Sequence, residues 1–175
     1  MGFHTKHKCI VITPQGFTTV AARALLRKLW KQLRGVPIYG LVDLNSAGAL
    51  ILSTFMIGSI TRAFDNLDLF VPPIRWICVL PSDVTGLKHI PTTPVSSRDR
   101  TTLKNLHHLY HSDKSKCTQA GIFVDLLENE YNVNIDAVID YYGGVEQYMI
   151  PKIPEMVVIK KKSKKKIQET QLVEV

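Results

Sequence analysis

The feature that most constrains the fold is a short apolar run that ends in an acid and turns directly into an apolar helix. Residues 37–42 (PIYGLV) have the composition of a buried strand, and residues 47–57 are mostly apolar up to Gly58. Asn45 or Ser46 can cap that helix. A strand that leads straight into a helix is typical of a parallel sheet covered by helices, so this unit predicts an α/β domain.

The segments on either side continue the same alternation. Residues 9–13 (CIVIT) and 74–80 (IRWICVL) have the apolar, β-branched composition of buried strands, and residues 20–33 have helical periodicity after a cap at Thr18 or Thr19. Further along, we expect a loop over 91–97, helices over 99–110 and 118–130, and short helical or irregular pieces over 134–142 and 145–153. The order predicts a mostly parallel, Rossmann-like sheet flanked by helices and followed by a helical region.

Composition excludes several classes of protein. About 45% of the 175 residues are hydrophobic, which is enough for a sizeable core in one domain. The longest apolar run, residues 47–57, is shorter than the roughly 20 residues of a membrane span, and residues 1–8 lack the pattern of a signal peptide. We therefore expect no membrane partner. Cys9, Cys78 and Cys117 are too widely spaced for a metal-type pair, which favours a reducing, intracellular compartment.

Much of the basic character lies in a terminal tail. Six lysines and two glutamates fall in residues 160–175, while the whole chain has a net charge of +7. The run 160–166 (KKKSKKK) cannot bury itself, so we expect a domain over 1–153 and a mobile, disordered tail over 154–175. The run can bind DNA non-specifically or direct the protein to the nucleus, and an ordinary solvated tail is an equal alternative.

The strongest chemical signal is the acid that follows the central strand. Ligands of open α/β sheets bind at the carboxyl edge of the strands, where Asp43 is expected to lie. Together with Asn45, it offers the oxygen ligands that Mg²⁺ prefers. Because Asn45 is neutral, the pair alone would hold the ion weakly. The alternatives are that Asp43 is a turn residue and that Asn45 is a helix cap.

Basic side chains repeat along the helix expected over 20–33. They are Arg23, Arg27, Lys31 and Arg34. Such a stripe is typical of a face that contacts DNA phosphates, and an ordinary solvated face is the alternative.

A histidine cluster and several acids also invite a chemical interpretation. His107, His108 and His111 have a spacing that permits two zinc ligands on a helix, but no acid or cysteine completes the set, so we expect surface histidines. Asp83 and Asp99 have no partner in the sequence, and Asp83 can cap a turn.

Several motifs, in order, resemble one family of DNA-cleaving proteins. Residues 36–48 (VPIYGLVDLNSAG) resemble the Asp-x-Asp/Asn-Pro-x-Gly segment of the Toprim domain in the meiotic double-strand-break transesterases, the eukaryotic relatives of the A subunit of topoisomerase VI. Upstream, residues 13–17 (TPQGF) and 21–23 (AAR) resemble its Thr-Gly-x-Gly-aromatic and Ala-Thr-Arg elements. Downstream, similar elements fall at residues 51–55, 58–59, 75–77 and 81–83. The similarity covers roughly residues 9–153.

This resemblance implies a Toprim-type fold, Mg²⁺ as cofactor, DNA as a partner, a homodimer, a B-type subunit of topoisomerase VI, and action in the nucleus. It matches Asp43 to the first metal acid and Arg23 to a family position, while Asn45, Ser46 and Pro14 stand where an acid, a proline and a glycine are usual. In the family, an upstream winged-helix domain supplies a tyrosine that attacks DNA, and a glutamate lies on the preceding strand. We find neither here, so we interpret the chain as a truncated Toprim portion that holds no catalytic residue and does not cleave DNA alone.

Two other functions are compatible with the sequence. A non-enzymatic module, such as a short isoform that binds DNA or a partner protein, agrees with the neutral Asn45. A receiver-like phosphoacceptor with Asp43 as its phosphorylated group is a third hypothesis, and it leaves the basic tail unexplained.

Overall fold

The computed structural model describes residues 2–58, 69–71, 73–77, 79–87, 89–111, 126 and 128–153. The chain divides into two compact units, Met1–Val138 and Ile139–Val175, and each is described by itself. Most of the helix expected over 118–130 lies outside the described residues, as does the tail expected over 154–175.

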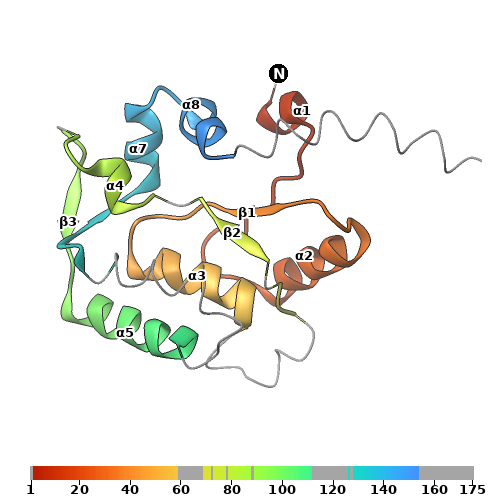
Figure 1. Cartoon of the computed structure of the whole chain (residues 1–175), viewed down its shortest axis with the longest axis horizontal. Coiled ribbons are helices and arrows are strands. Elements are labelled where there is room, and N and C mark those ends of the chain that lie inside the picture. Colours follow the sequence, from red (N-terminus) through yellow and green to blue (C-terminus); the bar gives the residue numbers. More distant parts are fainter. Residues whose placement is uncertain are drawn as a thin grey trace, which may run out of the picture. The chain divides into compact units, whose positions relative to one another are not determined.

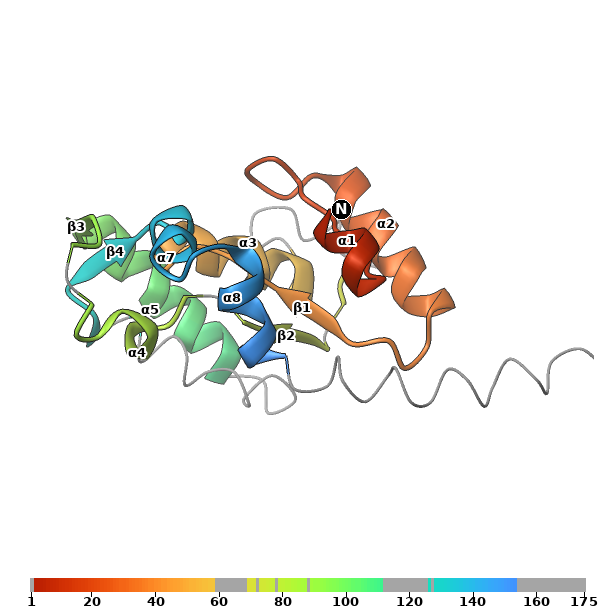
Figure 2. The ribbon, with the colours of Figure 1, turned by 90° about the horizontal axis from the view of Figure 1, so that it is seen from above.

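A parallel pair of strands organises the first unit (Figure 1). Strand β1 (Ile38–Gly40) pairs with β2 (Ile74–Trp76) in parallel register. The two strands also run side by side when they are seen from above (Figure 2). The strands expected over 37–42 and 74–80 are therefore confirmed with shorter bounds, and the α/β fold class is confirmed with them.

Two helices predicted from the sequence cover this pair of strands. They are α2 (Val20–Gln32) and α3 (Ser46–Ile57). The buried residues of their shared core are Leu52, Phe55, Met56, Val71 and Ile74. Ala22, Leu26 and Trp30 of α2 pack against the same cluster, so the apolar stripe of this helix faces the core.

The helix boundaries follow from capping side chains. The Thr19 hydroxyl oxygen accepts a hydrogen bond from the Ala22 N–H at 3.2 Å, which starts α2. Helix α3 ends at Gly58, whose φ of 96° lies in the left-handed region that glycine adopts at little cost. Gly48 is needed for close packing, because a Cβ there would lie 2.5 Å from the Asp43 carbonyl oxygen.

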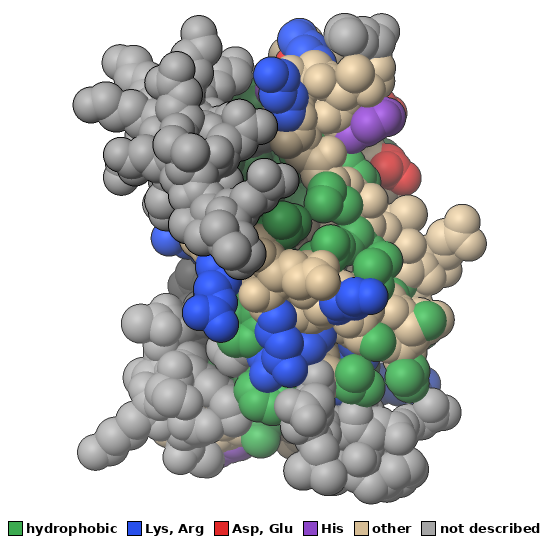
Figure 3. Space-filling model, turned by 90° about the vertical axis from the view of Figure 1, so that its right-hand side faces the viewer, with side chains coloured by type: hydrophobic (Ala, Val, Ile, Leu, Met, Phe, Trp, Pro, Cys, Tyr) green, Lys and Arg blue, Asp and Glu red, His purple; other side chains and the backbone are tan. Residues whose placement is uncertain are grey.

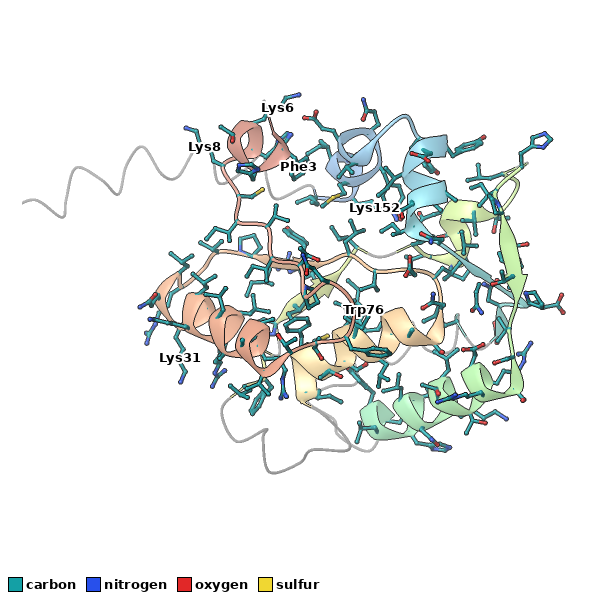
Figure 4. All side chains as sticks on the ribbon, turned by 180° about the vertical axis from the view of Figure 1, so that it is seen from behind. Phe3, Lys6, Lys8, Lys31, Trp76 and Lys152 are labelled. Carbon is teal, nitrogen blue, oxygen red and sulfur yellow. The ribbon has the colours of Figure 1, made fainter. Side chains whose placement is uncertain are left out.

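Helix α5 (Ser97–His111) packs against α3 and confirms the helix expected over 99–110. The Tyr110 hydroxyl donates to the Met56 sulfur at 3.7 Å, and burial raises the pKa of Tyr110 to about 12. The Trp76 ring reaches α3 (Figure 4), where its Nε1 donates to the sulfur of Met56 at 2.9 Å. Met56 thus joins β2, α3 and α5 in one core.

The expectation of a loop over 91–97 is wrong for residues 92–94, which form a strand. Strand β3 (Thr92–Pro94) pairs antiparallel with β4 (Tyr131–Val133). All of β3 is exposed, so it has no hydrophobic alternation by which the sequence could reveal it.

The buried strand expected over 9–13 is also wrong. This segment follows α1 (Phe3–His7) as irregular chain, and Ile10 and Val11 are 62% and 64% exposed. In the described part of the chain no strand pairs with it, so its apolar, β-branched composition is not matched by burial.

The remaining elements are short helices. They are α4 (Pro81–Val84), α7 (Ile135–Tyr141), α8 (Val145–Met149) and the 3₁₀ helix η3 (Ile150–Lys152). The helical pieces expected over 134–142 and 145–153 are therefore confirmed. Among the residues described, no helix combines the length and apolar character needed to cross a membrane.

Candidate functional site at the carboxyl edge of the sheet

Asp43 lies where the sequence places it, directly after the paired region of β1. Parallel hydrogen bonds continue beyond the strand, from the Ile77 N–H to the Gly40 carbonyl oxygen at 3.0 Å and from the Val79 N–H to the Val42 carbonyl oxygen at 3.4 Å. The next residue, Leu44, forms an antiparallel bridge with Val133. The acid therefore sits at the carboxyl edge of the parallel pair, where this class of sheet binds ligands.

One oxygen of the Asp43 carboxylate already has a structural role. Its Oδ1 accepts a hydrogen bond from the Ile135 N–H at 2.9 Å, at the first residue of α7. This bond satisfies a backbone donor that a helix leaves open at its start, and it joins segments 92 residues apart. The side chain is half-buried, and Oδ2 is the oxygen that this bond leaves for a ligand.

Asn45 acts as the cap of α3. Its Oδ1 accepts a hydrogen bond from the Gly48 N–H at 2.7 Å. The amide nitrogen of asparagine is a donor and not a metal ligand, so the one atom of this side chain that could bind a metal ion is the oxygen that already caps the helix. The capping alternative stated above therefore describes what Asn45 does in this structure.

Asp99 ties the loop that carries Asp43 to the start of α5. The Ser46 hydroxyl donates to Asp99 Oδ1 at 2.6 Å, and the Ser96 hydroxyl and N–H donate to Asp99 Oδ2 at 2.6 and 3.0 Å. These bonds stabilise the charged carboxylate, the one from Ser46 most strongly, and lower the pKa of Asp99 to about 2.

Sequence reasoning missed this network although half of it has a local signal. Asp99 N–H donates to the Ser96 hydroxyl oxygen at 3.1 Å, and Asp99 Oδ2 accepts from the Ser96 N–H, which is a reciprocal capping box. The spacing Ser96-x-x-Asp99 could have predicted it. The bond from Ser46 spans 53 residues and has no such local signal.

The described residues do not make a complete Mg²⁺ site by themselves. Asp43 has one carboxylate oxygen outside its helix cap, and both oxygens of Asp99 accept from serine groups. In the described ranges, no three His, Cys, Asp or Glu residues come together as a metal-binding group. Mg²⁺ is held by one or two carboxylates with retained waters, so this corner supplies at most a part of a site.

The structure divides the basic residues expected to form one exposed stripe. Arg23 is only 2% exposed, so the expectation of a solvated side chain is wrong for it. Arg27 is half-buried, and its Nη1 donates to the Phe70 carbonyl oxygen at 2.9 Å while its guanidinium lies over the Trp30 ring.

Lys31 and Arg34 are exposed, and Lys31 points away from the body of α2 (Figure 4). Lys28, which the sequence reading did not select, is exposed as well.

The other candidate residues have ordinary surroundings. His108 and His111 are exposed on α5 and His107 is half-buried, so the surface interpretation is confirmed for the first two. Asp83 Oδ2 accepts from the Leu80 N–H at 2.8 Å, which confirms that it caps a turn.

The fold and this edge define the class of protein. An acid at the carboxyl edge of a parallel strand, followed at once by a capped helix and a second parallel strand, is the α/β arrangement expected of a Toprim-type domain. The family model that describes the Toprim domain of Spo11 and of the A subunit of topoisomerase 6 matches residues 1–153. The chain belongs to this family, and the resemblance drawn from its motifs is confirmed.

Curated relatives agree with this assignment. Meiotic recombination protein SPO11-4 of Oryza sativa subsp. japonica is 40% identical over 108 residues, which cover 61% of this chain and 22% of that protein. The A subunit of DNA topoisomerase 6 of Arabidopsis thaliana is 35% identical over 107 residues, covering 59% and 25%. Meiotic recombination protein SPO11 of Homo sapiens is 36% identical over 101 residues, covering 56% and 25%. The chain therefore spans a quarter or less of the length of these relatives, and the receiver-like hypothesis has no support among them.

Proposed function

We propose that this chain is the Toprim part of a type IIB topoisomerase-like protein that makes meiotic double-strand breaks, and that alone it binds DNA without cleaving it. The observation that carries the proposal is the family match over residues 1–153 together with Asp43 at the carboxyl edge of β1. The relatives are named as meiotic recombination proteins and DNA topoisomerase subunits, which supports DNA as the substrate and the nucleus as the place of action. Family membership likewise supports two protein partners, a second copy of the chain in a homodimer and a B-type subunit.

The DNA contacts are assigned to the exposed cations on α2 and just after it. Lys28, Lys31 and Arg34 are exposed, whereas Arg23 and Arg27 are occupied with the core and with Phe70. Each phosphate that such a cation neutralises steepens the dependence of log affinity on log salt by about 0.9. We therefore narrow the predicted DNA-binding set to its exposed members and add Lys28.

The Mg²⁺ contribution is assigned to Asp43 Oδ2. Its position at the sheet edge and its charge support this assignment, and its Oδ1 remains on the Ile135 N–H. Asn45 Oδ1 already accepts from the Gly48 N–H, so a metal ion would have to share this oxygen with the helix cap. Since one carboxylate oxygen is a weak site, we expect low Mg²⁺ affinity for the chain alone.

Fluorescence anisotropy with a labelled DNA duplex tests the DNA-binding part. We expect Lys31→Ala to weaken binding and to lower the salt slope by about 1, since one phosphate contact is lost. Lys104→Ala is the matched control, because it removes an exposed lysine of α5 and should leave both quantities unchanged. Equal effects of the two substitutions would overturn the assignment to α2. Nicking or covalent attachment of DNA by the purified chain with Mg²⁺ would overturn the claim that it does not cleave alone.

A non-enzymatic DNA- or partner-binding module is the second candidate, and the capping bonds of Asp43 and Asn45 favour it. Calorimetric titration with Mg²⁺ separates the two functions. Binding that disappears in Asp43→Ala and persists in Asp136→Ala, an exposed acid of α7, supports the first. If the chain binds DNA but the titration with Mg²⁺ shows no heat of binding, the result supports the second function.

A further inference from the structure

Helix α5 carries two histidines, one turn apart, that the proposed function does not use. His107 and His111 are four residues apart in an unbroken α helix, so their side chains lie on the same face. Their ring centroids are 4.7 Å apart, and the ring planes are inclined by 78°. His107 is half-buried and His111 is exposed. The helix therefore brings two imidazole rings together at its surface.

The core holds this part of α5 in place. Leu103, Leu106 and Tyr110 face inward from the helix and are at most 2% exposed. Tyr110 stands between the two histidines in the sequence, and its hydroxyl donates to the Met56 sulfur of α3 at 3.7 Å. Since packing fixes the backbone here, an ion bound by the pair has to order only side-chain torsions, which lowers the entropic cost of binding.

The separation of the two rings fits one metal ion held by both. A Zn–N bond is about 2.0–2.1 Å long and the centre of an imidazole ring lies about 1.1 Å beyond its nitrogen, so a coordinated ring has its centroid about 3.2 Å from the ion. For an angle at the ion between about 90° and about 109°, two such centroids lie about 4.5–5.2 Å apart. The observed 4.7 Å falls in this interval. The last side-chain torsion of histidine is broad, so each ring can turn a nitrogen towards the ion at little cost.

The chemistry of the two rings identifies the ion. Imidazole nitrogens suit Zn²⁺ and its neighbours, whereas Mg²⁺ takes oxygen ligands. Two histidines at i and i+4 on one helix face are also the arrangement that binds Zn²⁺ in the His-Glu-x-x-His motif. The last turn of α5 carries the negative end of the helix dipole, which favours a cation there. Among the described residues no third His, Cys, Asp or Glu completes a group, so water fills the other positions of a tetrahedral Zn²⁺.

We propose that His107 and His111 together bind one Zn²⁺ ion and so brace the end of α5. This site is separate from the edge of the sheet, because His107 lies eight residues beyond Asp99, about 12 Å along the helix. It is also separate from the side of the molecule where α2 lies, on which basic and hydrophobic side chains are interleaved (Figure 3). The proposal therefore depends neither on Mg²⁺ at Asp43 nor on DNA binding.

The test is a calorimetric titration of the full chain, without an affinity tag, with Zn²⁺ at neutral pH. His111→Ala should weaken binding at this site about tenfold or more, because the ion loses one of its two protein ligands, and His107→Ala should do the same. His108→Ala is the matched control, since it removes an exposed histidine of the same helix and should leave the titration unchanged. Zn²⁺ that binds elsewhere in the chain is common to the wild type and all three variants, so the differences isolate the pair.

Nuclear magnetic resonance identifies the ligands directly. In long-range ¹H–¹⁵N spectra, Zn²⁺ should shift the ring nitrogens of His107 and His111 and leave those of His108 in place. The three single variants assign the signals. Because His111 is exposed, its replacement does not disturb the core, and the test stands even where His107→Ala lowers stability.

Several outcomes would overturn the proposal. They are the same Zn²⁺ titration for the wild type and His111→Ala, an equal loss in His108→Ala, or ring shifts confined to other histidines. One Zn²⁺ per two chains, with a dimer in sedimentation, would show that the rings bind the ion between copies and not within one helix. None of these results bears on whether Lys31 contacts DNA or Asp43 binds Mg²⁺, so the failure of this proposal and of the proposed function can be distinguished.

Discussion

Replacing Asp99 with asparagine tests how the loop that carries Asp43 is held. Asp99 accepts hydrogen bonds from Ser46 of α3 and from Ser96 at the start of α5, and these bonds lower its pKa from 3.8 to about 2. A difference of this size between the folded and unfolded chains corresponds to about 2 kcal/mol of folding free energy. Because the side chain is half-buried, solvent screening reduces the expected loss in Asp99→Asn to about 1–1.5 kcal/mol at neutral pH.

The pH dependence gives this prediction its sign. The folded pKa lies below the unfolded one, so the stabilisation is fully present above about pH 5, falls by about half near pH 3, and is lost as the pH drops through about 2. The difference in unfolding free energy between the wild type and Asp99→Asn should follow that curve. Urea denaturation monitored by far-UV circular dichroism at pH 7, 5 and 3 measures it. Asp136→Asn, at an exposed position of α7, is the control.

A double-mutant cycle separates the bond to Ser46 from the capping box. At pH 7, Ser46→Ala and Asp99→Asn should show a coupling energy of about 1 kcal/mol, since a hydrogen bond to a charged group contributes about 1.5–3 kcal/mol when buried and less when half-exposed. A stability difference between wild type and Asp99→Asn that stays constant from pH 7 to pH 3, or a coupling energy near zero, would refute the reasoning.

Two further stability predictions follow from the same sheet edge and its core. Asp43→Ala should lower the unfolding free energy by about 1 kcal/mol in urea denaturation, because it leaves the Ile135 N–H without its acceptor. Asp43→Asn keeps an acceptor oxygen and should lower it less. Equal stability of the wild type and both variants would contradict this prediction. Gly40→Ala should lower the unfolding free energy by about 1–3 kcal/mol in the same assay, because the added methyl group would meet the buried side chains of Leu52 and Ile74. An unchanged denaturation midpoint would show that these side chains move aside without a loss of stability.

The central part of the fold could be predicted because its signals are local. The run from β1 through Asp43 to α3 contains a strand pattern, a polar turn, a capping asparagine and a glycine at the helix end, all within about twenty residues. Each of these acts on its own neighbours, so the sequence alone locates the acid at the edge of the sheet. The strand at β2 then follows from composition.

The placement of the arginines could have been predicted from periodicity but was obscured by charge. Arg23 lies three residues before Leu26 and seven before Trp30, on the inward face of α2. A charged residue suggests an exposed position, and the tertiary structure overrides that preference here. The short strand β3 had no periodic signal, because all three of its residues are exposed.

Tertiary hydrogen bonds explain why the turn after β1 and residues 9–13 differ in the structure. The turn after β1 is fixed from three directions, by the bridge between Leu44 and Val133, by the bond from the Ile135 N–H to Asp43, and by the bond from Ser46 to Asp99. The Asp43 carboxylate is therefore held in place before any ligand binds, so binding there costs little conformational entropy.

Within the part of the chain that the structure describes, residues 9–13 form no bridge to a strand, and their backbone hydrogen bond is the local one from the Cys9 N–H to the His4 carbonyl oxygen, although their composition is as strand-like as that of β1. A strand is specified by its neighbours as much as by its own residues, because its hydrogen bonds and one or both faces need partners. The segment therefore keeps the composition of a buried strand while Ile10 and Val11 remain exposed, so its composition alone does not make it a strand.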